Sequence, residues 1–314
     1  MRCVSFTAAA VVVALAGQSA FATINIATQP IGFVGNNANN GTVGNLGAIN
    51  YQYNIGTYEV TNAQYAAFLN AVAATDTYGL FDPIGQSTFL GGINRSGSSG
   101  SYTYTARPGR ENAPANWVNF FDACRFANWM HNGQPTGAQG PATTEDGSYT
   151  LTAAAIANNT VTRNANATWA LPSESEWYKA AYYQPFALGG NPTGYWLYTN
   201  QSNSFPLVGQ LNAYNTVGNT TAVGSYAPNF FGLYDMGGNV FEWNEAALTP
   251  GNRNVRGSAY NYSGTETGAT VRYYNLPATL DTDAVGFRMV LIPSPGTATL
   301  LTLATLVATR RRRA

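Results

Sequence analysis

Apolar residues recur at helical spacing in several stretches of the chain, and capping residues precede them. In the stretch YEVTNAQYAAFLNAV (58–72), Thr61 and Gln64 have the spacing of a capping box. A capping box satisfies backbone N–H groups that have no partner at a helix N-terminus. The spacing therefore predicts a helix from Asn62 to about Ala73.

Two more helices are predicted later in the chain. Asn119 is a capping residue ahead of the stretch FFDACRFANWM, and Gly133 follows shortly after it. Ser173 and Glu176 have the spacing of another capping box, and WYKAAYY follows them. Each helix carries aromatic side chains on one face, and that face must be buried.

Between and after these helices, the apolar pattern shortens to alternation or is interrupted by Gly and Pro. The strand-length segments are TYEV (57–60), NVRGSAY (254–260), TVRYYN (270–275) and GFRMVL (286–291). Together, the patterns predict an α+β domain with a small antiparallel sheet, a few helices and much irregular loop.

The N-terminus has the pattern of a secretory signal peptide. Arg2 precedes an apolar run at 8–16, and the small-x-small motif AFA follows at 20–22. The apolar run is too short to span a bilayer stably. We therefore expect residues 1–22 to be removed after export, and we expect the protein in the cell envelope or outside the cell.

The C-terminal segment 293–314 combines Pro-Ser-Pro, a short apolar stretch and the arginines at 310–313. Arginines after an apolar stretch are retained on the cytoplasmic side of a membrane. The segment resembles the PEP-CTERM sorting tail of bacterial envelope proteins, with Ser294 where that pattern has Glu. The resemblance implies transient membrane anchoring, and an ordinary C-terminal membrane anchor is the alternative.

Composition narrows the class of partner. The chain has 15 basic and 15 acidic residues. Removing Arg2 and the four arginines at 310–313 takes away 5 of the 15 basic residues and leaves 10, without loss of an acid. A mildly acidic body argues against nucleic acid as a partner. The body between the two ends, residues 23–292, is long enough for one core and contains no evident linker.

Six motifs, in this order, resemble the formylglycine-generating enzyme or sulfatase-modifying-factor domain, whose members have a C-type-lectin-like α+β fold. The resemblance extends over most of the body. The motifs are YEVTNAQYAAFLNAV (58–72), PANWVNFFDACRFANWM (114–130), LPSESEWYKAAYY (171–183), VGSYAPNFFGLYDMGGNVFEWNEA (223–246), VRGSAY (255–260) and GFRMV (286–290).

The resemblance implies a structural Ca²⁺ in the loop GLYDMGGNVFEW. By position, its ligands are the side chains of Asp235 and Glu242 and the backbone carbonyls of Gly238 and Val240. Ca²⁺ is a hard cation that takes six to eight oxygen ligands. The alternative is a tight turn in which the two acids accept hydrogen bonds from backbone N–H groups.

The residues that carry catalysis in this family have no counterparts here. Formylglycine-generating enzymes oxidise a cysteine by means of two cysteines that bind Cu(I), and Asn261 and Glu266 occupy the matching positions. Cu(I) requires soft thiolates, and Cys124 is the one cysteine after the signal peptide. A related branch holds iron with three histidines, whereas this chain has only His131. We therefore expect neither copper nor iron and assign no catalytic residue.

Two function classes remain. The first is an exported, non-catalytic binding or structural module whose partner is a glycan or an envelope or extracellular protein. The second is a formylglycine-generating oxidase with an unrecognised cofactor arrangement. In the first, tyrosines give a large contact area at low entropic cost, although strand alternation would place half of them in the core. The expected ligand face consists of Tyr260, Tyr262, Arg272, Tyr273 and Tyr274.

Arginines near the end of the body have two expected roles. Arg256 and Arg288 lie beside strand residues and glycines. A guanidinium there can donate to several loop carbonyls and hold irregular chain together. We expect these two to be structural, and Arg272 to face a ligand.

Overall fold

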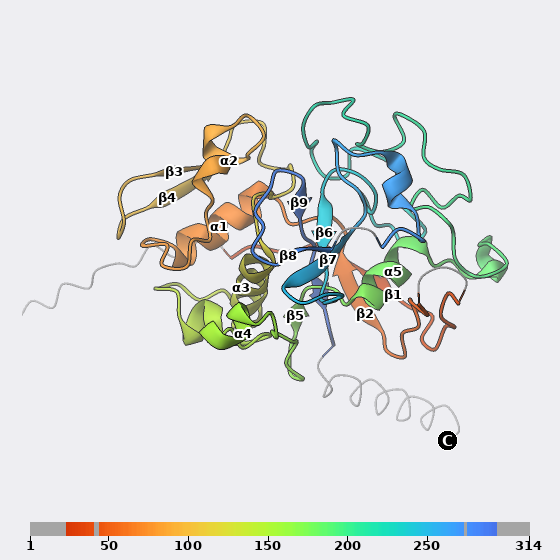
Figure 1. Ribbon diagram of the computed structural model, residues 1–314, viewed down its shortest axis with the longest axis horizontal. Helices are drawn as coiled ribbons and strands as arrows, with labels where there is room; N and C mark the ends of the chain where they lie inside the picture. The colour runs from red at the N-terminus through yellow and green to blue at the C-terminus, as the bar shows by residue number, and fades with distance from the viewer. Residues whose placement is uncertain (1–22, 41–43, 273–274, 294–314) are drawn as a thin grey trace, which may run out of the picture.

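A computed structural model describes the body of the chain (Figure 1). The described residues are 23–40, 44–272 and 275–293. The expected signal peptide and nearly all of the expected sorting tail lie outside them, as do Tyr273 and Tyr274. Within these ranges, no helix has the length and apolar character needed to cross a membrane.

The expected helices are present with their expected N-caps. Thr61 accepts a hydrogen bond from the N–H of Gln64, and Ser173 accepts one from the N–H of Glu176. Both capping boxes are complete, because each cap N–H also donates to the side chain three residues later. The helices are α1 (Asn62–Val72), α2 (Pro83–Ser87), α3 (Phe120–His131), α4 (Ala153–Ala157) and α5 (Glu174–Tyr182), with a π-helical turn at Pro141–Glu145 and 3-10 turns at Phe186–Leu188 and Gly264–Thr267.

The strands within the described residues form two four-stranded sheets and a hairpin. The first sheet has the order β1-β2-β10-β5, the second has the order β8-β7-β6-β9, and β3 pairs with β4. All pairs are antiparallel except β6 with β9. The strands are β1 (Thr28–Ile31), β2 (Tyr53–Gly56), β3 (Ile93–Ser96), β4 (Thr103–Ala106), β5 (Trp169–Ala170), β6 (Phe241–Trp243), β7 (Asn252–Arg256), β8 (Asn275–Pro277), β9 (Val285–Gly286) and β10 (Val290–Leu291).

The strand predictions are less accurate than the helix predictions. The segment TYEV is not a strand, because β2 ends at Gly56, just before it. The segment 254–260 is a strand only up to Arg256, since Gly257 and Ser258 have φ values of 99° and 71°. Such left-handed backbone cannot continue a β-ladder. The segment 286–291 contains parts of two strands that belong to different sheets.

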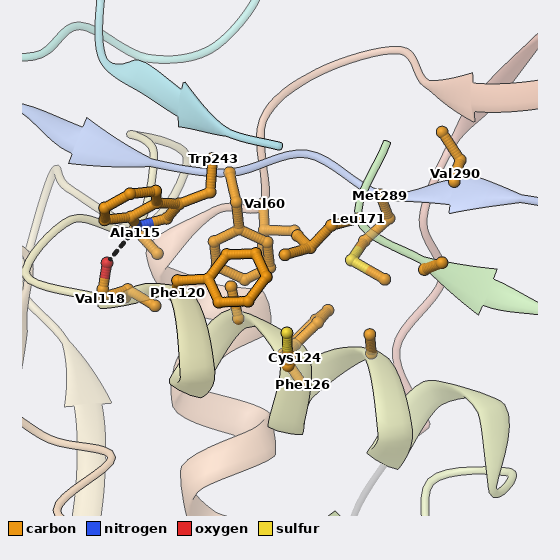
Figure 2. Close-up of a cluster of buried hydrophobic side chains, with 14 of the residues drawn as sticks. Val60, Ala115, Val118, Phe120, Cys124, Phe126, Leu171, Trp243, Met289 and Val290 are labelled. Carbon is orange, nitrogen blue, oxygen red and sulfur yellow. Dashed lines mark hydrogen bonds between the residues drawn. The ribbon is translucent and has the colours of Figure 1, made fainter. Parts of the chain in front are cut away.

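The core lies between the helices and the two larger sheets. Figure 2 shows Phe120, Cys124 and Phe126 of α3 directed at Trp243 of β6 and Met289. The Trp243 indole N–H donates to the carbonyl of Val118 at 2.9 Å, so its one polar group is satisfied inside the core. This packing fixes β6, and with it the loop that precedes β6, against α3.

Candidate binding site

The loop from Gly232 to Trp243 enters β6 through a chain of left-handed residues. Asp235, Gly238 and Asn239 have φ values of 54°, 84° and 64°. A Cβ on Gly238 would lie 2.4 Å from the carbonyl oxygen of Asn212, so only glycine fits there. Left-handed backbone at a residue other than glycine has an energetic cost and often marks functional sites. The surrounding chain therefore holds this loop in one defined conformation.

Glu242 is at the centre of a fully buried ion pair. Arg288 Nε lies 2.6 Å from Glu242 Oε2, and Arg288 Nη2 lies 2.5 Å from Oε1. The indole N–H of Trp177 also donates to Oε2, at 2.7 Å. Burial lowers the pKa of Arg288, but the adjacent carboxylate more than compensates and raises it above its ordinary value. Glu242 is thus committed to an internal structural pair.

This pairing bears on the expected calcium ligands. Both Glu242 oxygens are occupied, and the side chain has no exposed surface. Asp235 accepts a hydrogen bond from the N–H of Gly224 at 2.6 Å through one oxygen. No group of three or more His, Cys, Asp or Glu in the described chain could hold a metal ion. The calcium set stays a prediction, in which Glu242 would have to bind the ion while its oxygens also accept hydrogen bonds from Arg288.

Glu59 is an acid next to this site that the sequence patterns did not single out. It is 1% exposed, and neither carboxylate oxygen has a hydrogen-bond partner among the described residues. Burial and then the charge of Asp235 raise the pKa of Glu59 well above its ordinary value. Burial likewise raises the pKa of Asp235, to about 6. Both acids are therefore harder to ionise than exposed carboxyls, although Asp235, with a pKa of about 6, is mostly ionised at neutral pH.

The residues of the expected ligand face divide between interior and surface. Tyr260 is buried, and its hydroxyl donates to the carboxylate of Asp283. Tyr262 is half-buried, and its ring packs edge-on against Phe241 with centroids 4.9 Å apart. Arg272 retains 30% of its side-chain surface. Tyr260 therefore forms part of the interior, and Tyr262 and Arg272 are the described members that reach the surface.

Arg272 is also part of an ion-pair cluster that the sequence did not reveal. Its Nε lies 2.8 Å from Glu174 Oε1, and Arg256 Nη2 lies 2.6 Å from the same oxygen. Glu174 lies in the first turn of α5, where an acid also interacts favourably with the helix dipole. Arg256 donates to one backbone carbonyl and Arg288 to two, and each also pairs with a carboxylate. Both arginines therefore hold irregular backbone in place, as expected.

The positions that match the family's copper-binding cysteines are close to Tyr262 in the sequence. Asn261 is exposed and Glu266 is half-buried in the 3-10 turn that follows. Cys124 lies far from them in the sequence, fully buried in α3. His131 ends α3, and its Nδ1 accepts from the backbone N–H of Thr168. The described residues thus hold no pair of thiols and no cluster of histidines.

Solved structures share this fold. Treponema denticola variable protein 1 superposes with a TM-score of 0.57 and 19% identity, over 87% of this chain and 97% of that protein. A structure described as CarF superposes with a TM-score of 0.53 and 21% identity, over 86% and 99% of the two chains. At these identities, the similarity supports the fold alone.

Among curated proteins, the serine/threonine-protein kinase pkn1 of Chlamydia pneumoniae is 41% identical over 73 residues. That alignment covers 23% of this chain, and it spans only a tenth of the kinase. The kinase's activity therefore does not follow for this protein. The sequence model of the sulfatase-modifying factor enzyme 1-like domain matches residues 9–292. Since this match extends over most of the chain and the fold agrees, the protein belongs to the FGE-sulfatase family.

Proposed function

We propose that this protein is an exported, non-catalytic binding or structural module on the sulfatase-modifying-factor fold. The observation that carries the proposal is the position of the thiol. Cys124 is fully buried, and burial raises the pKa of its thiol well above the ordinary value. A protonated, enclosed thiol is neither a nucleophile nor a Cu(I) ligand. Asn261 and Glu266 offer no soft ligand in its place.

A surface suited to contact with a partner supports the binding role. Asn261 is exposed, its neighbour in the chain Tyr262 reaches the surface, and Arg272 is also partly exposed. Amide, phenol and guanidinium groups together supply donors, acceptors and aromatic area. A glycan or another envelope or extracellular protein is the partner that we propose.

Copper loading of the purified chain tests the non-catalytic part of the proposal. The full chain and its Cys124→Ser variant are incubated with Cu(I) without oxygen, desalted, and analysed for bound copper. A cysteine-containing sulfatase peptide with oxygen is then the substrate. We expect no stoichiometric copper and no peptide oxidation. Oxidation that requires bound copper would replace the proposal with the oxidase alternative.

Fractionation of cells that produce the tagged full chain tests export. We expect the protein in the envelope or the medium, shortened by its first 22 residues. A variant without residues 1–22 is the control, and it should stay in the cytoplasm. Removing residues 293–314 tests the anchor separately, because we expect this variant to leave the membrane fraction while still being exported. Cytoplasmic retention of the intact chain would contradict the proposal.

Calcium is tested by metal analysis and by thermal melts in EDTA and in calcium chloride. Because Glu242 is bound to Arg288, no part of the proposed function uses the ion. A melting temperature that falls in EDTA and recovers only with calcium would support the family's metal at Asp235. Identical melts would indicate a loop held by hydrogen bonds and the Glu242–Arg288 pair.

A further inference from the structure

A cavity of about 500 Å³ opens between two loops, residues 199–211 and 225–237. Its lining differs from the surface around Tyr262, because none of residues 260–274 takes part. We propose that this cavity binds a neutral, hydroxyl-rich ligand of the sugar class. The inference rests on the proposed binding function and names both a place and a ligand chemistry for it.

The cavity is formed by loops whose backbone is already fixed. The Asn229 side-chain oxygen accepts from the N–H groups of Phe231 and Leu233, and its amide donates to the carbonyl of Ala180 in α5. Asp235 Oδ2 accepts a hydrogen bond from the backbone N–H of Gly224, which directly precedes this loop. On the facing loop, the Gln210 side-chain oxygen accepts from the N–H of Leu207 at 2.8 Å. A preformed site of this volume is in the size range of small-molecule pockets.

One polar atom of a lining residue has no partner among the described residues. The Asn200 side-chain oxygen is buried without a hydrogen bond, while the amide nitrogen of the same side chain donates to Gln210 Oε1 at 3.4 Å. A donor on a ligand would supply the bond that this acceptor lacks. Tyr226 and Gln210 also line the cavity, and each side chain carries a group that can donate a hydrogen bond. Sugar hydroxyls both donate and accept, so they suit a wall that mixes the two kinds of group.

The charge and the floor of the cavity select the ligand class. Among the described residues, no lysine or arginine lines it, and Asp235 provides the one carboxylate. Phosphates, sulfates and acidic sugars would meet this carboxylate without a compensating cation. Leu211, Leu233 and Met236 add apolar surface that can contact the C–H faces of a sugar ring. Neutral sugars match both the polar wall and the apolar floor.

Saturation-transfer NMR tests the inference with four neutral sugars: maltotriose, cellotriose, mannotriose and N,N′-diacetylchitobiose. The full chain is kept in a detergent without a sugar headgroup. We expect at least one sugar to bind, and Asn200→Leu and Tyr226→Ala to weaken binding roughly tenfold or more. Asn200→Leu should change the melting temperature little, since it removes an unpartnered buried acceptor together with one long hydrogen bond of 3.4 Å from its amide nitrogen to Gln210 Oε1. If Asn200 had a purely structural role, Asn200→Leu would lower sugar affinity and the melting temperature together.

Phe89→Ala is the control, because its side chain is 75% exposed and does not line the cavity, and this variant should bind the sugar normally. Tyr262→Ala tests the proposed contact surface instead. Sugar binding that is weakened by Tyr262→Ala but not by the cavity variants would keep the binding function and overturn the cavity assignment. Binding of cadaverine with no response to any sugar would overturn the ligand class, because Asp235 would then be acting as an anchor for amines. No response to any of the four sugars also counts against the inference, whereas copper-dependent oxidation would overturn the proposed function instead.

Discussion

Replacing Arg288 with methionine should be among the most damaging single substitutions in this protein. The guanidinium has no exposed surface, forms two bonds to Glu242, and donates to the carbonyls of Gly56 and Tyr234. Methionine fills part of the volume but leaves a buried carboxylate without its cation. Breaking a buried pair in this way costs about 3–5 kcal/mol. A single domain has about 5–15 kcal/mol of stability, so the loss is a large fraction of the total.

The assay is urea denaturation followed by tryptophan fluorescence, with a thermal melt as a second measurement. A loss of about 3–5 kcal/mol corresponds to a fall in Tm of about 6–20 °C for a domain of this size. Arg272→Met is the control, because its side chain is 30% exposed and Glu174 keeps Arg256 as a second partner. The control should lose no more than about 1 kcal/mol.

A double variant separates the unpaired charge from lost packing. Arg288→Met with Glu242→Leu removes both charges, and apolar replacements of buried ion pairs are often neutral or stabilising. We therefore expect the double variant to be more stable than Arg288→Met alone, even if the single variant fails to fold. The reasoning is refuted if Arg288→Met costs no more than Arg272→Met, or if the second substitution adds to the damage.

Three further predictions follow from burial and capping. Burial raises the pKa of Asp235 to about 6, so the folded state binds the Asp235 proton more tightly than the unfolded state does. The stability that this proton contributes is therefore lost as pH rises from about 4 through 6. In urea melts from pH 4 to 8, the free energy of unfolding should change less with pH in Asp235→Asn than in the unmodified protein, by up to about 3 kcal/mol. An equal pH dependence in the two proteins would show that Asp235 does not titrate in this window. Cys124 should react with a thiol reagent only after denaturation, because it is fully buried and its pKa is raised; rapid labelling of the native protein would contradict this burial. Thr61→Ala should cost about 1 kcal/mol by removing the α1 cap, and Thr152→Ala should cost less because α4 has no buried residues; equal losses in urea melts would refute this ranking.

The sequence predicts local structure well in this protein. The capping boxes at Thr61 and Ser173 are readable because their partners are three residues away. Strand limits depend on pairing between distant segments, so TYEV was wrongly assigned to a strand and β2 was missed. The left-handed backbone of Ser258 has no signal in its residue type.

The candidate site was less predictable because its partners are far apart in the chain. Glu242 and Arg288 are 46 positions apart, and Glu174 and Arg272 are 98 apart. No periodicity in the sequence relates residues this far apart. Taken alone, Glu174 is explained by its place at a helix N-terminus, and Glu242 is explained as a metal ligand. The cavity between loops 199–211 and 225–237 is formed by irregular chain, for which hydrophobic patterns give no geometry.

The position of β10 in its sheet has a consequence for the order of events during synthesis. This strand contains residues near the end of the body, yet it lies between β2 and β5 in the middle of the first sheet. In Figure 1 the last strands cross the centre of the molecule. A growing chain therefore cannot complete its sheet until its last segment has emerged. If the protein is exported unfolded through a translocation channel, as we propose, this arrangement delays folding until the whole body is available on the far side.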